Sequence, residues 1–189
     1  HQQLHLENKT LKCENNHCYD ISKRGYINLL LNPDKATNNP GDSKESLVAR
    51  KAYLNKGYYD PILNQVITCI DEFKHQDDLS ILDLGCGEGY YTQGLKKHFE
   101  NSDIYGLDIS KIAIDMATRY RKDVTWLVGN SKNIPILNHS LDFICALFTV
   151  VNQDELKRAL KEDGYIITKN GDEYSILLYN YNPMIDNIL

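Results

Sequence analysis

One stretch decides the fold of this chain: Ser80-Ile81-Leu82-Asp83-Leu84-Gly85-Cys86-Gly87-Glu88-Gly89-Tyr90-Tyr91. An apolar run rich in strand-forming residues leads into three glycines at alternate positions, and a helical pattern follows them. This is the order of a first strand, a tight turn and a helix N-terminus in an open α/β sheet. Glycine permits positive φ and lets a ligand approach the backbone without Cβ atoms in the way. The stretch therefore predicts an α/β fold with a ligand bound at this turn.

The glycine spacing and one carboxylate indicate which ligand binds there. A single residue separates Gly87 from Gly89, whereas the dinucleotide fingerprint has two residues at that point. Asp83, two places before Gly85, would repel a pyrophosphate but would attract an amino acid that carries a sulfonium and an ammonium group. The pattern Asp-x-Gly-x-Gly-x-Gly resembles the first motif of S-adenosylmethionine-dependent methyltransferases. The alternative is a glycine-rich turn without a ligand.

Size and composition are those of a soluble globular protein with one full core and a small appendage. The chain has 189 residues, of which 42% are hydrophobic and 25% charged. It has no run of some twenty apolar residues and no secretory signal pattern, so we expect no membrane association. Its five irregularly spaced cysteines suggest no disulfide framework, and we therefore expect a cytoplasmic location. Because it begins with His1, we expect that its true start is missing.

Charge argues against a protein that coats nucleic acid non-specifically, since the net charge is −5. The first sixty residues, however, carry nine Lys/Arg against seven Asp/Glu, while the remainder carries twelve against nineteen. A mildly basic N-terminal module beside an acidic catalytic domain is compatible with RNA that docks through that module.

The N-terminal residues carry half of a metal-site pattern. Leu4, Leu6 and Leu11 surround a polar turn and predict a short hairpin. Cys13 and His17 follow, four positions apart, which is a spacing found in half of a tetrahedral zinc site. A buried cysteine beside a surface histidine is the alternative on these residues alone.

A specific resemblance covers residues from about Leu11 to about Tyr165. Its motifs are the following: Arg24-Gly25-Tyr26-Ile27-Asn28-Leu29-Leu30, Gly41-Asp42-Ser43, Ala49-Arg50-Lys51-Ala52-Tyr53-Leu54, Gly57-Tyr58-Tyr59, and Asp83 through Thr92. Together they resemble the bacterial large-subunit (23S) ribosomal RNA guanine-N1 methyltransferases, the RlmA family. The glycine motif alone is generic, and the N-terminal set makes the resemblance specific.

The resemblance implies fold, domains and metal. It implies a Rossmann-like class I methyltransferase sheet over residues 41–189 and a small zinc-ribbon-like module for RNA recognition over residues 1–40. The family module binds zinc through a Cys-x-x-Cys pair followed by Cys-x-x-x-His. Cys13 and His17 fall on the second half, and the first pair would lie upstream of His1. The implied partner is ribosomal RNA, and a homodimer is left open.

Two helices are expected before the glycine turn. A polar loop over residues 32–43 precedes the first, which Asp42 or Ser43 caps and Gly57 ends. Pro61 then leads into the second helix.

The second half of the chain alternates strands and helices, including a helix over Gln153–Lys161, and contributes further candidate cofactor residues. Asp108 ends the second predicted strand, where an acidic side chain can accept both ribose hydroxyls of a nucleoside; a helix cap is the alternative. Asn130 and Ser131 follow the third strand, where methyltransferases of this fold hold the adenine edge, and Ile109 supplies an apolar face for the ring. The predicted cofactor-binding residues are Tyr59, Asp83, Gly85, Cys86, Gly87, Glu88, Asp108, Ile109, Asn130 and Ser131.

The predicted reaction is methyl transfer from S-adenosylmethionine to N1 of a guanine in 23S ribosomal RNA. The spacing indicates no proton acceptor. The base must be unstacked and received by aromatic side chains, and residues around Phe148 to Asn152 should border it. The candidates to receive the base are Tyr58, Tyr59, Tyr90 and Tyr91. The alternatives are a small-molecule methyltransferase, and a non-catalytic RNA-binding protein that retains the cofactor fold. Only one clear strand, Tyr174–Tyr179, follows Thr168, so we expect the C-terminal part to be incomplete.

Overall fold

The computed structural model describes residues 2–8, 10–30, 41–169 and 176–180. Its main element is a seven-stranded sheet in the order β10-β9-β8-β5-β6-β7-β4. All neighbours are parallel except β10, which is antiparallel to β9. The strands are β4 (Ile27–Asn28), β5 (Ser80–Leu84), β6 (Asp103–Asp108), β7 (Thr125–Val128), β8 (Leu141–Ala146), β9 (Leu160–Lys169) and β10 (Ile176–Tyr179). The predicted open α/β sheet is confirmed.

Strand β5, the predicted first strand, lies at the centre because its residues are apolar on both faces. Ile81 and Leu82 are fully buried, on opposite sides of the sheet. The sheet runs from β5 to β6 on one side and to β8 on the other, so the strand order reverses at the end of β5. In open α/β sheets, ligands bind at this reversal, beyond the carboxyl ends of the strands. The glycine turn lies there.

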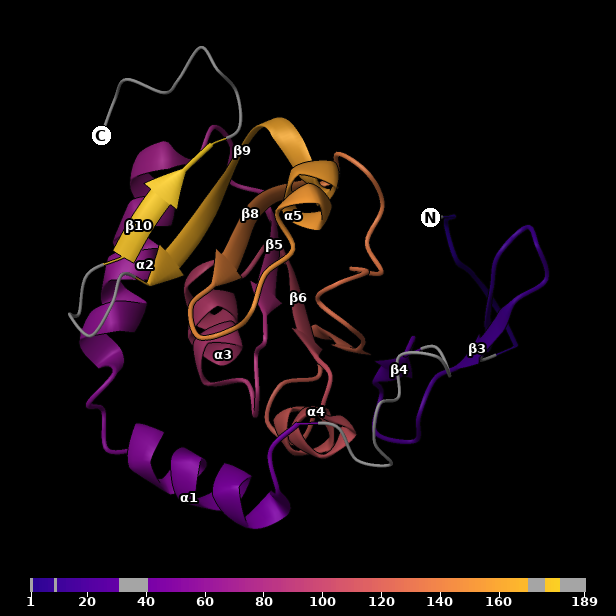
Figure 1. The fold of residues 1–189 in the computed structure, drawn as a ribbon, viewed down its shortest axis with the longest axis horizontal. Coiled ribbons are helices and arrows are strands. Elements are labelled where there is room, and N and C mark those ends of the chain that lie inside the picture. Colours follow the sequence, from indigo (N-terminus) through magenta and orange to yellow (C-terminus); the bar gives the residue numbers. More distant parts are fainter. Residues whose placement is uncertain (1, 9, 31–40, 170–175, 181–189) are drawn as a thin grey trace.

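Helices cover the two faces unequally (Figure 1). α2 (Asp60–Phe73), α3 (Tyr90–His98) and α4 (Lys111–Ala117) pack on one face, through a core that includes Ile70, Leu95 and Trp126. On the other face α5 (Gln153–Ala159) buries Leu156 and Ala159 against β8 and β9. α1 (Lys44–Leu54) lies across the end of the sheet beside α4, at the carboxyl ends of the central strands.

The predicted start of α1 is confirmed by its cap. Ser43 has an extended backbone, and its Oγ accepts a hydrogen bond from the Ser46 amide at 3.2 Å. The next helix begins with Pro61 in its first turn, as expected after Gly57, whose φ is +79°. The turn between them places Tyr59 beside the central strands.

The N-terminal residues form a small antiparallel sheet of β1 (His5–Glu7), β2 (Thr10–Lys12) and β3 (Cys18–Asp20). Leu6 pairs with Leu11, so the predicted hairpin is confirmed. β4 then leaves this module and pairs with Leu127 and Val128 of β7, at the edge of the large sheet. The N-terminal module is thus attached to the main domain by backbone pairing as well as by the chain.

Two predicted boundaries differ from the structure. The helix expected to reach Lys161 ends at Ala159, because Leu160 pairs with Leu141 and Lys161 Nζ bonds Asp142 Oδ1 at 2.8 Å. β9 therefore begins directly after α5. The expected last strand is β10, which begins at Ile176. The first residues of that expected strand, and most of the loop expected before α1, lie outside the described residues.

No helix among the described residues is long and apolar enough to cross a membrane.

Candidate cofactor-binding site

The glycine turn connects β5 to α3 and is held against the end of β6. The backbone amides of Gly85 and Cys86 both donate to the carbonyl oxygen of Leu107, at 2.8 and 3.0 Å. The amide of Gly87 donates to Asp108 Oδ2 at 2.9 Å. These contacts fix the turn to the neighbouring strand, so its shape is set before any ligand binds.

The third glycine is required by close packing. Gly89 has φ of +85°, and a Cβ built there would lie 2.5 Å from the indole ring of Trp126. Trp126 is buried beneath the turn, and its Nε1 donates to the carbonyl of Arg121 at 2.9 Å. The turn therefore lies directly on the aromatic core. At Gly87 the situation is the opposite, because a Cβ would meet only Arg50 Nη1, at 3.6 Å.

A cavity of about 290 Å³, hereafter the glycine-loop cavity, opens at this turn. Its volume is near the lower end of the range for small-molecule sites. It combines the end of β5, the glycine turn, the start of α3, the end of α1 and the segment after β8. The residues that line it are Arg50, Tyr53, Leu54, Tyr59, Asp83, Leu84, Gly85, Cys86, Gly87, Glu88, Tyr90, Tyr91, Leu147 and Phe148.

Six of the ten predicted cofactor residues thus lie around one cavity: Tyr59, Asp83, Gly85, Cys86, Gly87 and Glu88. Asp108 adjoins this cavity through its hydrogen bond to the Gly87 amide. Ile109, the residue directly after β6, is half-buried. Asn130 instead lines a different cavity, and its Oδ1 accepts from the Lys132 amide at 3.0 Å. Ser131 is half-buried and is not among the residues that line either cavity.

Three carboxyl groups surround the turn. Asp83 and Glu88 are each 3% exposed, and Asp108 is half-buried. The pKa of Asp83 is raised to about 7, mainly by burial and to a smaller extent by repulsion from Asp108 and Glu88. The hydroxyl of Thr92, which donates to Asp83 Oδ2 at 2.5 Å, opposes this rise. Burial also raises the pKa of Glu88 and of Asp108. Such a cluster favours a cationic ligand, which would relieve the repulsion.

Among the described residues that line the cavity, Arg50 carries the only cationic side chain. It extends from α1 and forms an ion pair with Asp42. Its charge partly offsets the rise that burial causes in the pKa of Glu88 and of Asp108. Arg50 is not among the site residues predicted from the sequence. The helical pattern of α1 indicated which residues are buried, but nothing in it indicated that this helix crosses the glycine turn.

Aromatic side chains form the rim of the cavity at the end of β8. The ring centroid of Phe148 lies 6.0 Å from that of Tyr59 and 6.1 Å from that of Tyr91. Phe148 is 57% exposed although it lies only two residues after the buried strand β8. Tyr53 joins the same group, with its centroid 5.1 Å from Tyr58 and 6.1 Å from Tyr59. The rim can therefore stack against a planar ring.

The cysteine of the turn is not a nucleophile. Cys86 is buried, and burial raises the pKa of its thiol well above the usual range. The same holds for Cys145 inside β8. Both side chains belong to the core beneath the cavity.

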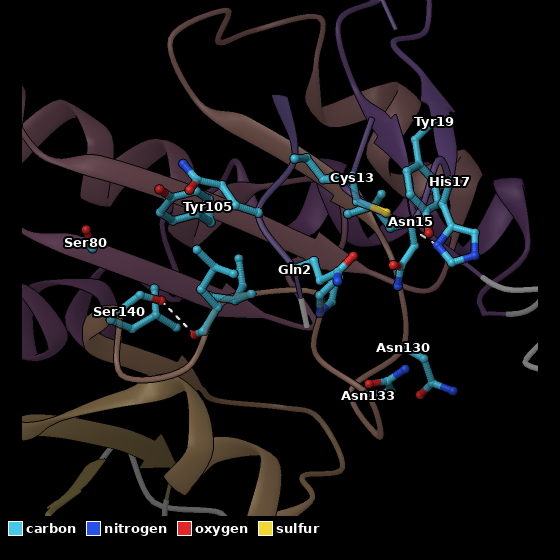
Figure 2. Close-up of a pocket in the computed structure, with 17 residues that line it drawn as sticks. Gln2, Cys13, Asn15, His17, Tyr19, Ser80, Tyr105, Asn130, Asn133 and Ser140 are labelled. Atoms are coloured by element: carbon cyan, nitrogen blue, oxygen red, sulfur yellow. Dashed lines mark hydrogen bonds between the residues drawn. The ribbon is translucent and has the colours of Figure 1, made fainter. Parts of the chain in front are cut away.

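Cys13 and His17 line a second, larger cavity of about 690 Å³ between the N-terminal module and the large sheet (Figure 2). Cys13 Sγ lies 3.4 Å from His17 Nδ1. Two ligands of one tetrahedral zinc ion, at about 2.3 Å for sulfur and about 2.0–2.1 Å for nitrogen, are about 3.5 Å apart, so the pair fits half of such a site. Within the described parts of the chain, no group of three or more His, Cys, Asp or Glu side chains could hold a metal ion.

Comparison with known proteins matches the two parts of the chain separately. Residues 1–36 match the zinc-ribbon family model described as RlmA, N-terminal, and residues 81–171 match a methyltransferase domain. A crystal structure assigned as an S-adenosylmethionine-dependent methyltransferase from Methanococcus maripaludis has the same fold, with a TM-score of 0.58, 21% identity, and coverage of 70% of this chain and 66% of that one.

Two curated relatives extend across both parts. A Bacillus subtilis (strain 168) protein assigned as a 23S rRNA (guanine-N1-)-methyltransferase is 31% identical over 165 residues, which are 84% of this chain and 57% of that protein. The 23S rRNA (guanine(748)-N1)-methyltransferase of Streptomyces fradiae is 27% identical over 166 residues, or 87% of this chain and 58% of that protein. The chain thus spans less than two thirds of the length of these relatives.

Proposed function

We propose that this chain, which is a relative of the 23S rRNA (guanine-N1-)-methyltransferases and carries an RlmA-type N-terminal module, belongs to an enzyme that methylates N1 of a guanine in 23S ribosomal RNA. The observation that carries the proposal is the coexistence of that module with a carboxylate-lined glycine turn at the reversal of strand order. The module alone indicates no chemistry, and the turn alone indicates no substrate.

The cofactor of the methyltransferase domain is S-adenosylmethionine, which supplies a methyl group bound to a positively charged sulfur. The cavity fits such a ligand, because three carboxyl groups face the turn and Glu88 Oε1 is buried without a hydrogen-bond partner among the described residues. We assign Asp83 and Glu88 to the cationic amino-acid end and Asp108 to the ribose. Asp108 Oδ2 accepts from the Gly87 amide and Oδ1 from the Ser110 amide, at 2.9 and 2.7 Å. Because a carboxylate accepts about four hydrogen bonds, Asp108 can still accept from a ribose. Tyr59, Gly85, Cys86 and Gly87 form the walls.

The adenine contacts of Ile109, Asn130 and Ser131 stay a prediction. Ile109 follows Asp108 directly and is half-buried, which suits an apolar contact beside the ribose. For Asn130 to contribute, its side chain must release the Lys132 amide and turn from the larger cavity.

The N-terminal zinc is held, in this proposal, by Cys13 and His17 together with two further ligands. The separation of their ligand atoms supports the assignment. Zinc binding to a structural site contributes on the order of 10–16 kcal/mol to folding of such modules. Removal of the metal should therefore unfold the module and leave the large sheet intact.

We expect Cys13→Ser to reduce the zinc content of the whole protein from about one ion to nearly none. Binding of S-adenosylmethionine should change less than about twofold, while methylation of ribosomal RNA should be lost, because the module recognises RNA. Elemental analysis, calorimetry and a methylation assay measure the three effects. Cys18→Ser is the matched control, since Cys18 is exposed and its thiol contacts the Asn16 carbonyl at 3.5 Å. Loss of zinc in the control variant alone would identify Cys18 as the ligand instead.

A small-molecule methyltransferase is the second candidate. The exposed aromatic rim suits a small planar acceptor as well as an RNA base, since either could stack there. A non-catalytic RNA-binding protein is disfavoured by the retention of Asp83, the glycines and Asp108 around one cavity.

Methyl transfer from labelled S-adenosylmethionine to unmodified 23S ribosomal RNA tests the proposal, with the whole protein and zinc present. We expect label in 1-methylguanosine after digestion of the RNA to nucleosides. Label in another nucleoside would contradict the guanine-N1 assignment. Label only in small acceptors such as free guanosine would favour the second candidate. Sedimentation of the same preparation tests the homodimer.

A further inference from the structure

The glycine-loop cavity contains a buried hydroxyl that the assignments above do not use. Among the described residues, Glu88 Oε1 and Tyr91 Oη are the buried side-chain oxygens without a hydrogen-bond partner, and both residues line this cavity. An unsatisfied buried polar group costs about 1–3 kcal/mol, and few remain in native proteins. Two in one cavity indicate that a ligand supplies the missing partners.

The two oxygens require different partners. Glu88, when ionised, can only accept hydrogen bonds, which suits the ammonium and hydroxyl donors of the cofactor. Burial raises the pKa of Tyr91, and the nearby Tyr90, Asp83 and Tyr59 raise it to a lesser extent. The oxygen of Tyr91 therefore carries a proton at neutral pH and can donate a hydrogen bond. The partner of Tyr91 is therefore a hydrogen-bond acceptor.

The position of Tyr91 indicates that this acceptor belongs to the substrate. Its ring lies beside Phe148, at 6.1 Å between centroids and 31° between planes. Phe148 is the exposed aromatic residue at the carboxyl end of β8, and Lys169 Nζ lies 5.7 Å from its ring centroid. Tyr91 thus connects the glycine turn with the aromatic rim, where a planar acceptor can stack. Its unpartnered hydroxyl belongs to a residue that lines both the cofactor cavity and this rim.

We propose that Tyr91 Oη donates a hydrogen bond to O6 of the target guanine and thereby stabilises the negative charge that develops when N1 loses its proton. The inference rests on the proposed function, and it makes Tyr91 a catalytic residue. A donor fixed where charge develops lowers the barrier because it needs no reorganisation during the reaction.

The N1 proton of guanine passes to solvent water, and the electron pair left behind is shared between N1 and O6. N1 forms a bond to the methyl carbon, while the bond from that carbon to sulfur breaks and its electron pair stays on sulfur. The hydroxyl proton of Tyr91 remains on its own oxygen throughout, so Tyr91 acts as a hydrogen-bond donor and not as a general acid.

The test is Tyr91→Phe in the whole protein, which keeps the ring and removes only the hydroxyl. We expect kcat for methylation of 23S ribosomal RNA to fall on the order of 10²-fold, as when one such donor is removed elsewhere. Affinity for S-adenosylmethionine, measured by calorimetry without RNA, should change less than about twofold. Since an unpartnered hydroxyl is removed, the melting temperature should stay unchanged or rise.

The pH dependence separates a catalytic hydroxyl from a structural one. Without the donor, ionisation of the bound guanine becomes harder, so the pH-rate profile of the variant should move to higher pH. The ratio of wild-type to variant rate should then shrink as pH rises. Asp83, Tyr59 and Tyr90, the other titratable groups that act on this position, are present in both proteins, so their effects on the rate largely cancel in the ratio.

Tyr165→Phe is the matched control. Tyr165 is buried against Phe143 and Phe73, away from the cavity, so the same chemical change there should leave the rate unaltered. A Tyr91→Phe rate deficit that is constant with pH, or a parallel loss of cofactor affinity, would overturn the role of Tyr91. So would an unchanged rate in an enzyme that forms 1-methylguanosine. A wild-type enzyme that forms none overturns the proposed function and this inference together.

Discussion

Asp83→Asn should make the unliganded protein more stable than the wild type at pH 8 and remove most of the pH dependence of that stability. The pKa of Asp83 is raised to about 7 in the folded protein, from an ordinary value of 3.8. Between these values the folded state holds a proton that the unfolded state has lost. Wild-type stability therefore falls as pH rises, by about 1.4 kcal/mol per unit at most, and levels off above the folded pKa. The full effect is on the order of 4 kcal/mol.

The measurement is the free energy of unfolding in urea at several values between pH 5 and 8. Asparagine has nearly the shape of aspartic acid and carries no charge at any of these values, so the slope should be lost. The same variant should bind S-adenosylmethionine on the order of 10²-fold more weakly, because the buried negative charge that faces the cationic ligand is gone. Stability and binding thus change in opposite directions.

Asp103→Asn is the control for the loss of one negative charge. Asp103 is exposed at the start of β6, and its substitution should alter neither the slope nor the affinity. Equal pH slopes in wild type and Asp83→Asn would show that Asp83 is ionised in the folded protein, and would contradict the description of the carboxyl cluster.

Gly89→Ala should destabilise the protein by about 2–5 kcal/mol. One part is the positive φ of +85°, which costs about 1–2 kcal/mol for a residue with a Cβ. The larger part is the contact with Trp126, only 2.5 Å from the new Cβ, since overpacking of a core costs about 1–3 kcal/mol. Displacement of the indole would also disturb Gly106, which contacts the same ring.

Gly25→Ala separates the two parts. Gly25 has φ of +96° and nothing within 4 Å of a built Cβ, so only the backbone cost applies there. Denaturant unfolding of both variants should therefore differ by about 1–3 kcal/mol. Addition of Trp126→Leu should recover part of the loss in Gly89→Ala, relative to Trp126→Leu alone. If the two glycine variants lose the same stability, Trp126 does not pack as described.

The sequence was sufficient for the features that local patterns determine. Alternating apolar runs and helical periods gave the strands and helices of the sheet, and the spacing of Gly85, Gly87 and Gly89 after a buried strand gave the position of the cavity. The Ser43 cap and the Gly57 turn were predicted because their geometry depends on residues within a few positions.

Features that depend on residues far apart in the sequence could not be predicted from local patterns. The crossing of α1 over the turn, which brings Arg50 to Glu88 and Asp108, depends on how two helices pack. Likewise, the N-terminal module joins the large sheet through the pairing of Ile27 with Leu127, two residues that are a hundred positions apart in the sequence. The hydrogen bond from Thr92 to Asp83 and the unpartnered hydroxyl of Tyr91 appear only when the strand and helix are placed together.

The most direct test of the account is a calorimetric titration of the wild-type protein with S-adenosylmethionine and, separately, with S-adenosylhomocysteine, between pH 6 and 8. The two ligands carry the same ammonium and carboxylate groups but differ in the charge on sulfur, so the ratio of their affinities reports the charge around the sulfonium. We predict that this ratio rises in favour of S-adenosylmethionine as pH passes about 7, when Asp83 ionises. A ratio that is independent of pH, or no binding of either ligand, would contradict the assignment of the carboxylate-lined glycine turn as the cofactor site.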